Sequence, residues 1–162
     1  MTTEVKITEE MLQEAIKKAE NLPSLKNSIR SGAGNLVGFL GEIVAKEVLG
    51  GSLKNTYDYD LVLDCGKTVD VKTKETSFKP KPHYECSVAS FNTKQKCDYY
   101  AFVRVDLKKN LAWFLGVYKK EDYYKDSRLL KKGEIDPSNN FTVKADCYNL
   151  EIRHLKASVN DT

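Results

Sequence analysis

The chain has 162 residues, of which 41% are hydrophobic and 30% are charged, and its formal net charge is +3. This length and balance indicate one folded domain with its own core, and the aromatic content of 10% argues against a disordered chain. The small positive charge tolerates a polyanionic partner without requiring one. No apolar run is long enough for a signal peptide or a membrane span. We therefore expect a cytoplasmic protein that has no membrane partner.

The four cysteines show neither C-x-x-C spacing nor a cluster with histidine, so the sequence does not predict a zinc site. Free thiols in a reducing compartment are the simplest interpretation.

The first predicted helix begins after Thr8, which is a suitable N-cap because Glu9 and Glu10 follow it at the positive end of the helix. It ends at Asn21-Leu-Pro23. A second helix is predicted over Asn35–Leu49 and ends at two glycines.

Glycines inside the second predicted helix point to a close approach. Gly38 and Gly41 each cost about 1 kcal/mol of helix stability relative to alanine, which is easier to explain if another part of the chain packs closely there. Glu42 follows Gly41, so we expect its flank to lie near a sheet. The alternative is an ordinary surface glutamate.

Two strand-like runs, Thr56–Leu63 and Lys67–Glu75, predict a β-hairpin. A two-residue loop would place Asp60 and Asp70 on opposite faces of it. A three-residue loop, Asp64-Cys65-Gly66, would put glycine at the left-handed position that such loops favour and would set Asp60 opposite Asp70.

The three-residue loop divides the hairpin cleanly into two faces, and we favour it for that reason. One face is polar apart from one valine, and the other is apolar and aromatic. The polar face carries Asp58, Asp60, Val62, Thr68, Asp70, Lys72 and Lys74, and the core face carries Tyr57, Tyr59, Leu61, Leu63, Val69 and Val71.

The remaining pattern predicts an α/β fold with a mixed central sheet of four to five strands flanked by helices. Further strands are expected at Tyr84–Ala89, Tyr99–Val105 and Leu111–Tyr118, with short helices at Ser90–Asp98 and Lys120–Lys125. Residues 131–140 are expected to form a loop, and Phe141–Leu155 to return to a sheet edge.

Carboxylates that face each other across a hairpin repel one another unless a cation is present. Asp60 and Asp70, with Glu42 from the helix and the backbone carbonyl of Val71, are suitable ligands for Mg²⁺ or Mn²⁺. Lys72 could orient a water molecule or neutralise charge on a phosphate. Asp58 shares the polar face and could replace Asp60.

The D/E-x-K pattern is weak on its own, because Glu4-x-Lys6 and Asp106-x-Lys108 also show it. Only Asp70-x-Lys72 lies inside an apolar strand. The alternative without a function is that these residues form the solvent-facing polar side of an antiparallel hairpin.

The order of Glu42, Asp60 and Asp70-x-Lys72 resembles the PD-(D/E)xK nuclease superfamily, which has the restriction-endonuclease-like fold. Three stretches are similar to those of small phage-encoded members: Asn35-Leu-Val-Gly-Phe-Leu-Gly-Glu42, Tyr57-Asp-Tyr-Asp60 and Val69-Asp-Val-Lys-Thr-Lys74.

The resemblance implies a single nuclease-like domain over residues 1–162. Its parts would be an N-terminal helix region (1–27), a catalytic core (28–118) and a C-terminal extension (119–162). It further implies that Glu42, Asp60 and Asp70 bind Mg²⁺, that Lys72 is catalytic, and that the substrate is DNA. A homodimer in the host cytoplasm fits such a protein, because many of these nucleases cut two strands with two sites. Two departures are the short crossing helix and Tyr59, where the superfamily motif has proline.

A second set of residues is expected to contact nucleic acid. Gln95 falls where some members of the superfamily keep a glutamine, the backbone before Asn35 could bind a phosphate, and Lys74 continues the polar face. Tyr84 and His83 are weaker candidates, and Trp113 and most tyrosines are expected in the core. A basic rim is expected from Arg30, Lys79, Lys81, Lys94 and Lys96.

Three functions are weighed, of which the first is the leading hypothesis and the second the main alternative. They are a metal-dependent nuclease, a non-cleaving nucleic-acid- or protein-binding module of the same fold, and a structural protein with a polar hairpin face. The sequence does not decide between DNA and RNA, or between endonuclease and exonuclease action.

Overall fold

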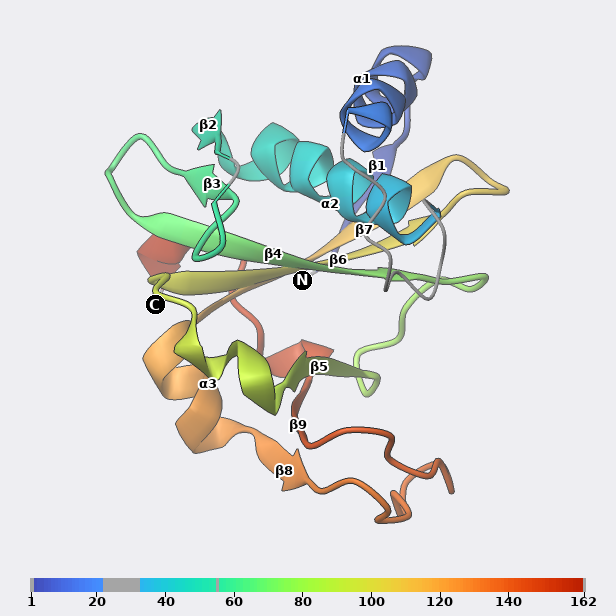
Figure 1. The fold of residues 1–162 in the computed structure, drawn as a ribbon, viewed down its shortest axis with the longest axis vertical. Helices are drawn as coiled ribbons and strands as arrows, with labels where there is room; N and C mark the ends of the chain where they lie inside the picture. Colours follow the sequence, from blue (N-terminus) through green and yellow to red (C-terminus); the bar gives the residue numbers. More distant parts are fainter. Residues whose placement is uncertain (1, 22–32, 55, 162) are drawn as a thin grey trace.

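A computed structural model describes residues 2–21, 33–54 and 56–161. The predictions made for Arg30 and for the connection before residue 33 lie outside these residues. The described chain forms a mixed α/β structure with a central sheet of six strands in the order β1-β7-β6-β4-β3-β2. Helices α1 and α2 cover one face of this sheet, and a small second sheet with helix α3 lies on the other (Figure 1).

The three helices are α1 (Glu9–Glu20), α2 (Ala33–Leu49) and α3 (Lys120–Asp126). The central sheet contains β1 (Thr3–Lys6), β2 (Ser52–Leu53), β3 (Leu61–Val62), β4 (Thr68–Glu75), β6 (Tyr99–Asp106) and β7 (Leu111–Lys119). The second sheet has the order β5-β9-β8, from β5 (Glu85–Ala89), β8 (Arg128–Leu130) and β9 (Cys147–Glu151).

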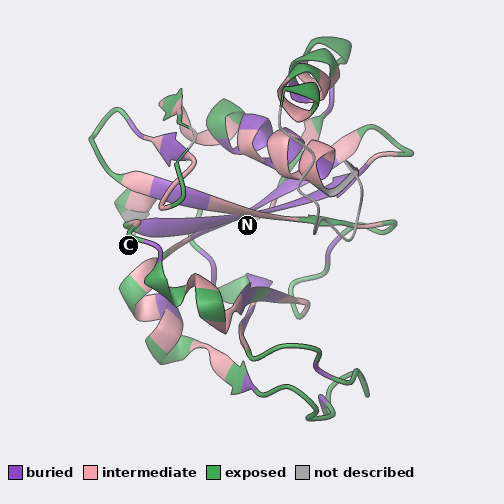
Figure 2. Ribbon diagram, in the orientation of Figure 1, coloured by how far each residue is buried: buried purple, intermediate pink, exposed green. Residues whose placement is uncertain are grey.

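The middle of the central sheet is formed by β4 and β6, which run parallel, and by β7, which pairs antiparallel with β6. Every residue of β6 is buried, as expected for a strand that is covered on both faces (Figure 2). The side chains of β6 alternate between two cores. Ala101 and Val103 pack under α2, whereas Tyr100 and Phe102 pack against α3 and the second sheet.

Helix α1 begins where the sequence predicts, because the hydroxyl of Thr8 accepts a hydrogen bond from the N–H of Met11 at 3.2 Å. Helix α2 packs tightly on β4 at Gly41. A Cβ added there would lie 2.7 Å from the Cβ of Thr73 and closer still to its Oγ1. The prediction of a close approach is confirmed at this glycine, whereas nothing lies within 4 Å of a Cβ added at Gly38.

The three-residue loop of the hairpin is confirmed. The N–H of Leu63 donates to the carbonyl of Lys67 at 2.9 Å, and Gly66 has φ +89°. The register pairs Leu61 with Val69, so that one further step brings Asp60 level with Asp70.

The first strand of the hairpin is much shorter than predicted. Only Leu61–Val62 forms a strand, and residues 56–60 form bends. Tyr57, expected on the core face, is 67% exposed.

Other predictions of topology were wrong. The central sheet has six strands rather than four to five, because two short strands, β1 and β2, carry too little pattern to be recognised. The strand predicted at Tyr84–Ala89 belongs to the second sheet, where it pairs with β9. Its partner β9 is the middle strand of that sheet rather than an edge. The helix predicted at Ser90–Asp98 is a 3-10 turn over Ser90–Lys94.

All four cysteines are free, as predicted. Among the described residues, no helix combines the length and the apolar character needed to cross a membrane.

Candidate metal and phosphodiester site

Asp60 lies at an open edge of β4, and the shortness of β3 is the cause. Because β3 ends at the level of Val69, the N–H of Val71 on the same edge has no backbone partner in a neighbouring strand. The Oδ2 of Asp60 accepts this N–H at 2.8 Å. The side chain of Asp60 therefore replaces the backbone carbonyl that a longer β3 would have offered to Val71, and this hydrogen bond fixes its carboxylate beside β4.

Glu42 reaches the same place from α2. Its half-buried carboxyl has a pKa raised from 4.5 to about 8, mainly by burial and then by the negative charge of Asp60. Asp70 adds a smaller effect in the same direction, and Lys18 of α1 opposes it. The pKa of Asp60 is raised from 3.8 to about 7 by burial and by Asp70, against the hydrogen bond from Val71. The negative charge of Asp70 thus acts on both Glu42 and Asp60, and that of Asp60 acts on Glu42.

Asp70 lies on the opposite face of β4 from α2 and is only 4% exposed. The Nζ of Lys72 is 2.7 Å from its Oδ2 and 3.0 Å from the Oε1 of Gln95. Gln95 in turn donates to the carbonyl of Tyr57 at 2.8 Å and to the Oδ1 of Asp70 at 3.4 Å. Gln95 is 7% exposed, so it belongs to the site and not to a solvated helix surface.

The donor set fits a divalent cation. The Oδ2 of Asp70 is buried and accepts no hydrogen bond, since Lys72 approaches it within ion-pair distance but outside hydrogen-bond angles. The pKa values of Glu42 and Asp60 are raised by burial and by neighbouring carboxylates, and a bound cation would oppose both effects. The carbonyl of Val71 points to the same open edge as its N–H, because both groups of a strand residue face one side.

The acidic groups are not drawn together into a finished cluster. Within residues 2–21, 33–54 and 56–161, no group of three or more His, Cys, Asp and Glu side chains is assembled closely enough to form a metal-binding set. Lys72 occupies the position against Asp70 instead. A cation would have to draw the carboxylates inward, which is a side-chain movement.

Competing acidic residues have other partners. Asp58, the alternative to Asp60, accepts the N–H of Lys96 at 2.9 Å. Asp98 binds both the N–H and the hydroxyl of Thr68 at the start of β4. Asp106 caps the β6–β7 turn by accepting two backbone N–H groups, which explains the second D-x-K pattern as a turn signal.

Among the remaining predicted nucleic-acid contacts, Lys74 lines one small cavity together with Lys72. Lys74 is exposed near the end of β4, and Lys79 and Lys81 are exposed in the loop that follows it. Asn35 is half-buried in the first turns of α2. Trp113 is buried, as expected for a core residue.

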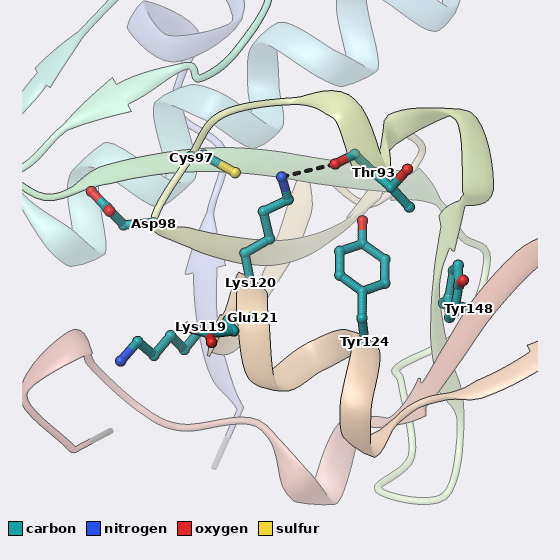
Figure 3. A pocket seen from close by; sticks show the side chains of 8 residues that line it. All are labelled: Thr93, Cys97, Asp98, Lys119, Lys120, Glu121, Tyr124 and Tyr148. Atoms are coloured by element: carbon teal, nitrogen blue, oxygen red, sulfur yellow. Dashed lines mark hydrogen bonds between the residues drawn. The ribbon is translucent and has the colours of Figure 1, made fainter.

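Lys120 is a positioning residue that the sequence did not reveal. Its ammonium group donates to the carbonyl of Thr93 at 3.0 Å (Figure 3). It also donates to the carbonyl of Gln95, so α3 holds the segment that carries Gln95. Both Lys120 and Thr93 line a pocket of about 550 Å³ on this side of the sheet. A lysine at the start of a short helix gives no local signal of this long-range contact.

Arg104 was also missed, although a signal existed. It is the only charged residue within the otherwise apolar run Tyr99–Val105, and it pairs in register with Lys74.

No protein-family model matches the chain, and no curated protein matches it significantly. The interpretation of the site therefore depends on its geometry and on its chemical groups.

Proposed function

We propose that this protein is a metal-dependent nuclease that hydrolyses phosphodiester bonds in DNA. The observation that carries the proposal is the electrostatic coupling of Glu42 and Asp60 with Asp70 near the open edge of β4, with Lys72 held 2.7 Å from Asp70. A purely structural surface has little use for two half-buried carboxyls whose pKa values are raised to about 8 and about 7.

Glu42, Asp60, Asp70 and the carbonyl of Val71 would hold Mg²⁺ or Mn²⁺. When bound, such an ion lowers the pKa of its water and stabilises negative charge on a phosphate oxygen.

The chain supplies the other parts of the chemistry. Gln95 accepts from the ammonium group of Lys72 and so fixes the position of that positive charge. Lys72 can then orient an attacking water molecule or neutralise charge that builds up on the phosphate. Asp60 keeps its orientation because the N–H of Val71 binds one of its oxygens, which leaves the other oxygen for the cation.

The resemblance of Glu42, Asp60 and Asp70-x-Lys72 to the PD-(D/E)xK superfamily supports the same proposal, including the expected restriction-endonuclease-like core. The parallel pairing of β4 with β6, with α2 packed on one face, is compatible with that core. DNA is proposed as the substrate on this resemblance.

The test is cleavage of plasmid, single-stranded and branched DNA, and of RNA, with Mg²⁺, with Mn²⁺ and with a chelator. We expect cutting that requires the metal and that Asp70→Ala and Lys72→Ala reduce by at least about a hundredfold, the range seen when groups that stabilise a transition state are removed. Asp106→Ala is the matched control, because it removes the aspartate of the other D-x-K pattern. Cutting that survives Asp70→Ala would refute the assignment.

A second candidate is a non-cleaving binding module. It is favoured by the contact of Lys72 with both Asp70 and Gln95, which engages one of the proposed metal ligands in an ion pair. Binding of nucleic acid with no cutting under any metal condition would support this candidate instead.

A further inference from the structure

A basic groove lies next to the candidate site, between the end of β4 and the second sheet. It has a volume of about 940 Å³, and its walls include Lys74, Arg104 and Arg128. A smaller cavity of about 100 Å³ is lined by Lys72, Lys74 and Arg104. The two cavities share Lys74 and Arg104, so these two cations stand between the groove and the candidate catalytic lysine.

Lys74 and Arg104 are direct partners on neighbouring parallel strands. Their side chains therefore project to the same face, about 5 Å apart at the backbone. Like charges placed opposite each other in a sheet are destabilising. The pKa of Lys74 is lowered by burial and by the charge of Arg104, whereas the pKa of Arg104 is lowered by burial alone.

The charge of Arg104 is not compensated. The side chain is only 7% exposed, yet no carboxylate among the described residues lies within ion-pair distance of it. Its guanidinium donates to the carbonyl of Glu85 at 3.0 Å and lies 5.6 Å from the ring centroid of Tyr84. A guanidinium has five N–H donors, so this environment leaves most of its hydrogen-bonding capacity for a ligand.

The acidic residues of the groove already have partners. Glu85 and Asp136 both bind Arg128, and Glu151 binds Arg153 at 3.1 Å. Two carboxylates therefore oppose the single charge of Arg128, and Arg104 has no ion-pair partner. Among the lysine, arginine and carboxylate side chains that line the groove, positive charges exceed negative ones by one. Burying an unpaired cation is costly, and a bound anion removes that cost.

We propose that Lys74 and Arg104 form a phosphate-binding site for the nucleic-acid strand whose scissile phosphate lies at Lys72. The choice of a nucleic-acid strand rests on the proposed function. Lys72 and Lys74 are two residues apart on one face of β4, about 6–7 Å along the strand, so a strand lying along β4 presents one phosphate to each. The phosphate is either an internal phosphodiester or a terminal phosphate group.

The test is binding of a short labelled single-stranded DNA oligonucleotide in chelator, where no cutting takes place. We expect Arg104→Met to weaken binding by at least about tenfold, the size of a charge-assisted hydrogen bond. The dependence of log K on log salt should become shallower by about 0.7, as for the loss of one phosphate contact to a single strand. Lys74→Gln should act in the same direction. Lys125→Gln, which removes one exposed positive charge on α3, is the matched control.

A thermal unfolding curve separates this role from a structural one. A phosphate-binding Arg104 opposes folding of the free protein, so Arg104→Met should leave the melting temperature unchanged or raise it, and inorganic phosphate should stabilise the wild type more than the variant. Equal losses of affinity for oligonucleotides with a 5′-phosphate and a 5′-hydroxyl indicate an internal phosphodiester. A loss confined to the 5′-phosphate oligonucleotide indicates a terminal group.

Unchanged affinity and salt dependence in both Arg104→Met and Lys74→Gln would overturn the inference, whether or not the protein cuts DNA. Conversely, weakened binding in these variants of a protein that never cuts would refute the nuclease proposal and leave the phosphate site standing.

Discussion

Replacing Glu42 by glutamine should stabilise the metal-free protein at alkaline pH. The carboxyl of Glu42 has a pKa of about 8 in the folded protein and 4.5 as its ordinary value. Between these values the native protein binds more protons than the unfolded chain, so the free energy of unfolding falls as the pH rises through this window. Below pH 4.5 the carboxyl is protonated in both the folded and the unfolded protein, and the destabilisation caused by burying its charged form disappears.

The size of the effect follows from the same two values. A difference of about 3.5 pH units, at about 1.4 kcal/mol per unit, sets an upper limit of about 5 kcal/mol. Glu42 is half-buried, and solvent screening and side-chain movement reduce this limit to about 1–3 kcal/mol. For a domain of this length, that stabilisation raises the melting temperature by about 3–10 °C.

The assay is thermal unfolding in chelator from pH 5 to pH 9, with Glu47→Gln as control because Glu47 is exposed on the same helix. The melting temperature of Glu42→Gln relative to wild type should increase from pH 5 to pH 9, whereas that of Glu47→Gln should show no such increase. Added Mg²⁺ should restore wild-type stability at pH 9 and should help Glu42→Gln less. A Glu42→Gln protein that is less stable than wild type at every pH would refute the reasoning.

Two further predictions concern the supports of the site. Gly41→Ala should destabilise the protein by about 1–3 kcal/mol, because the new methyl group overlaps Thr73. Gly38→Ala, with open space, should instead stabilise by up to about 1 kcal/mol; equal effects of the two substitutions on denaturant unfolding would contradict the packing of α2. Gln95→Leu should slow single-turnover cleavage by about 10- to 100-fold with little loss of stability, because Lys72 loses the acceptor that positions it. An unaltered rate would show that Gln95 does not position Lys72.

The hairpin could be predicted from the sequence because its information is local. The Asp64-Cys65-Gly66 turn and the apolar residues Leu61 and Leu63, flanked by Asp60 and Asp64, indicate both the loop type and the register, and the structure has that loop and that register. The start of helix α1 could be predicted for the same reason, since Thr8 caps it directly.

The second sheet, β5-β9-β8, could not be predicted because its pairing depends on residues that are far apart in the sequence. The strand-like alternation at Glu85–Ala89 says that a strand forms but not which sheet it joins, and its partner β9 lies about sixty residues further along the chain. Gln95 and Lys120 reach the site through that same layer. Arg104 was visible as a lone cation in an apolar strand, but its meaning depends on the parallel pairing that sets it beside Lys74.

The largest error of strand length bears directly on the candidate site. An unbroken strand over Thr56–Leu63 would have paired with β4 beyond Val69 and satisfied the N–H of Val71 from its own backbone. The strand instead begins only at Leu61, and Asp60, the residue before it, supplies a carboxylate oxygen to that N–H. The same interruption leaves the edge of β4 at Val71 without a paired strand, beside Asp60. Local strand propensity was overruled where the chain places acidic groups at an open edge, as expected at a functional site.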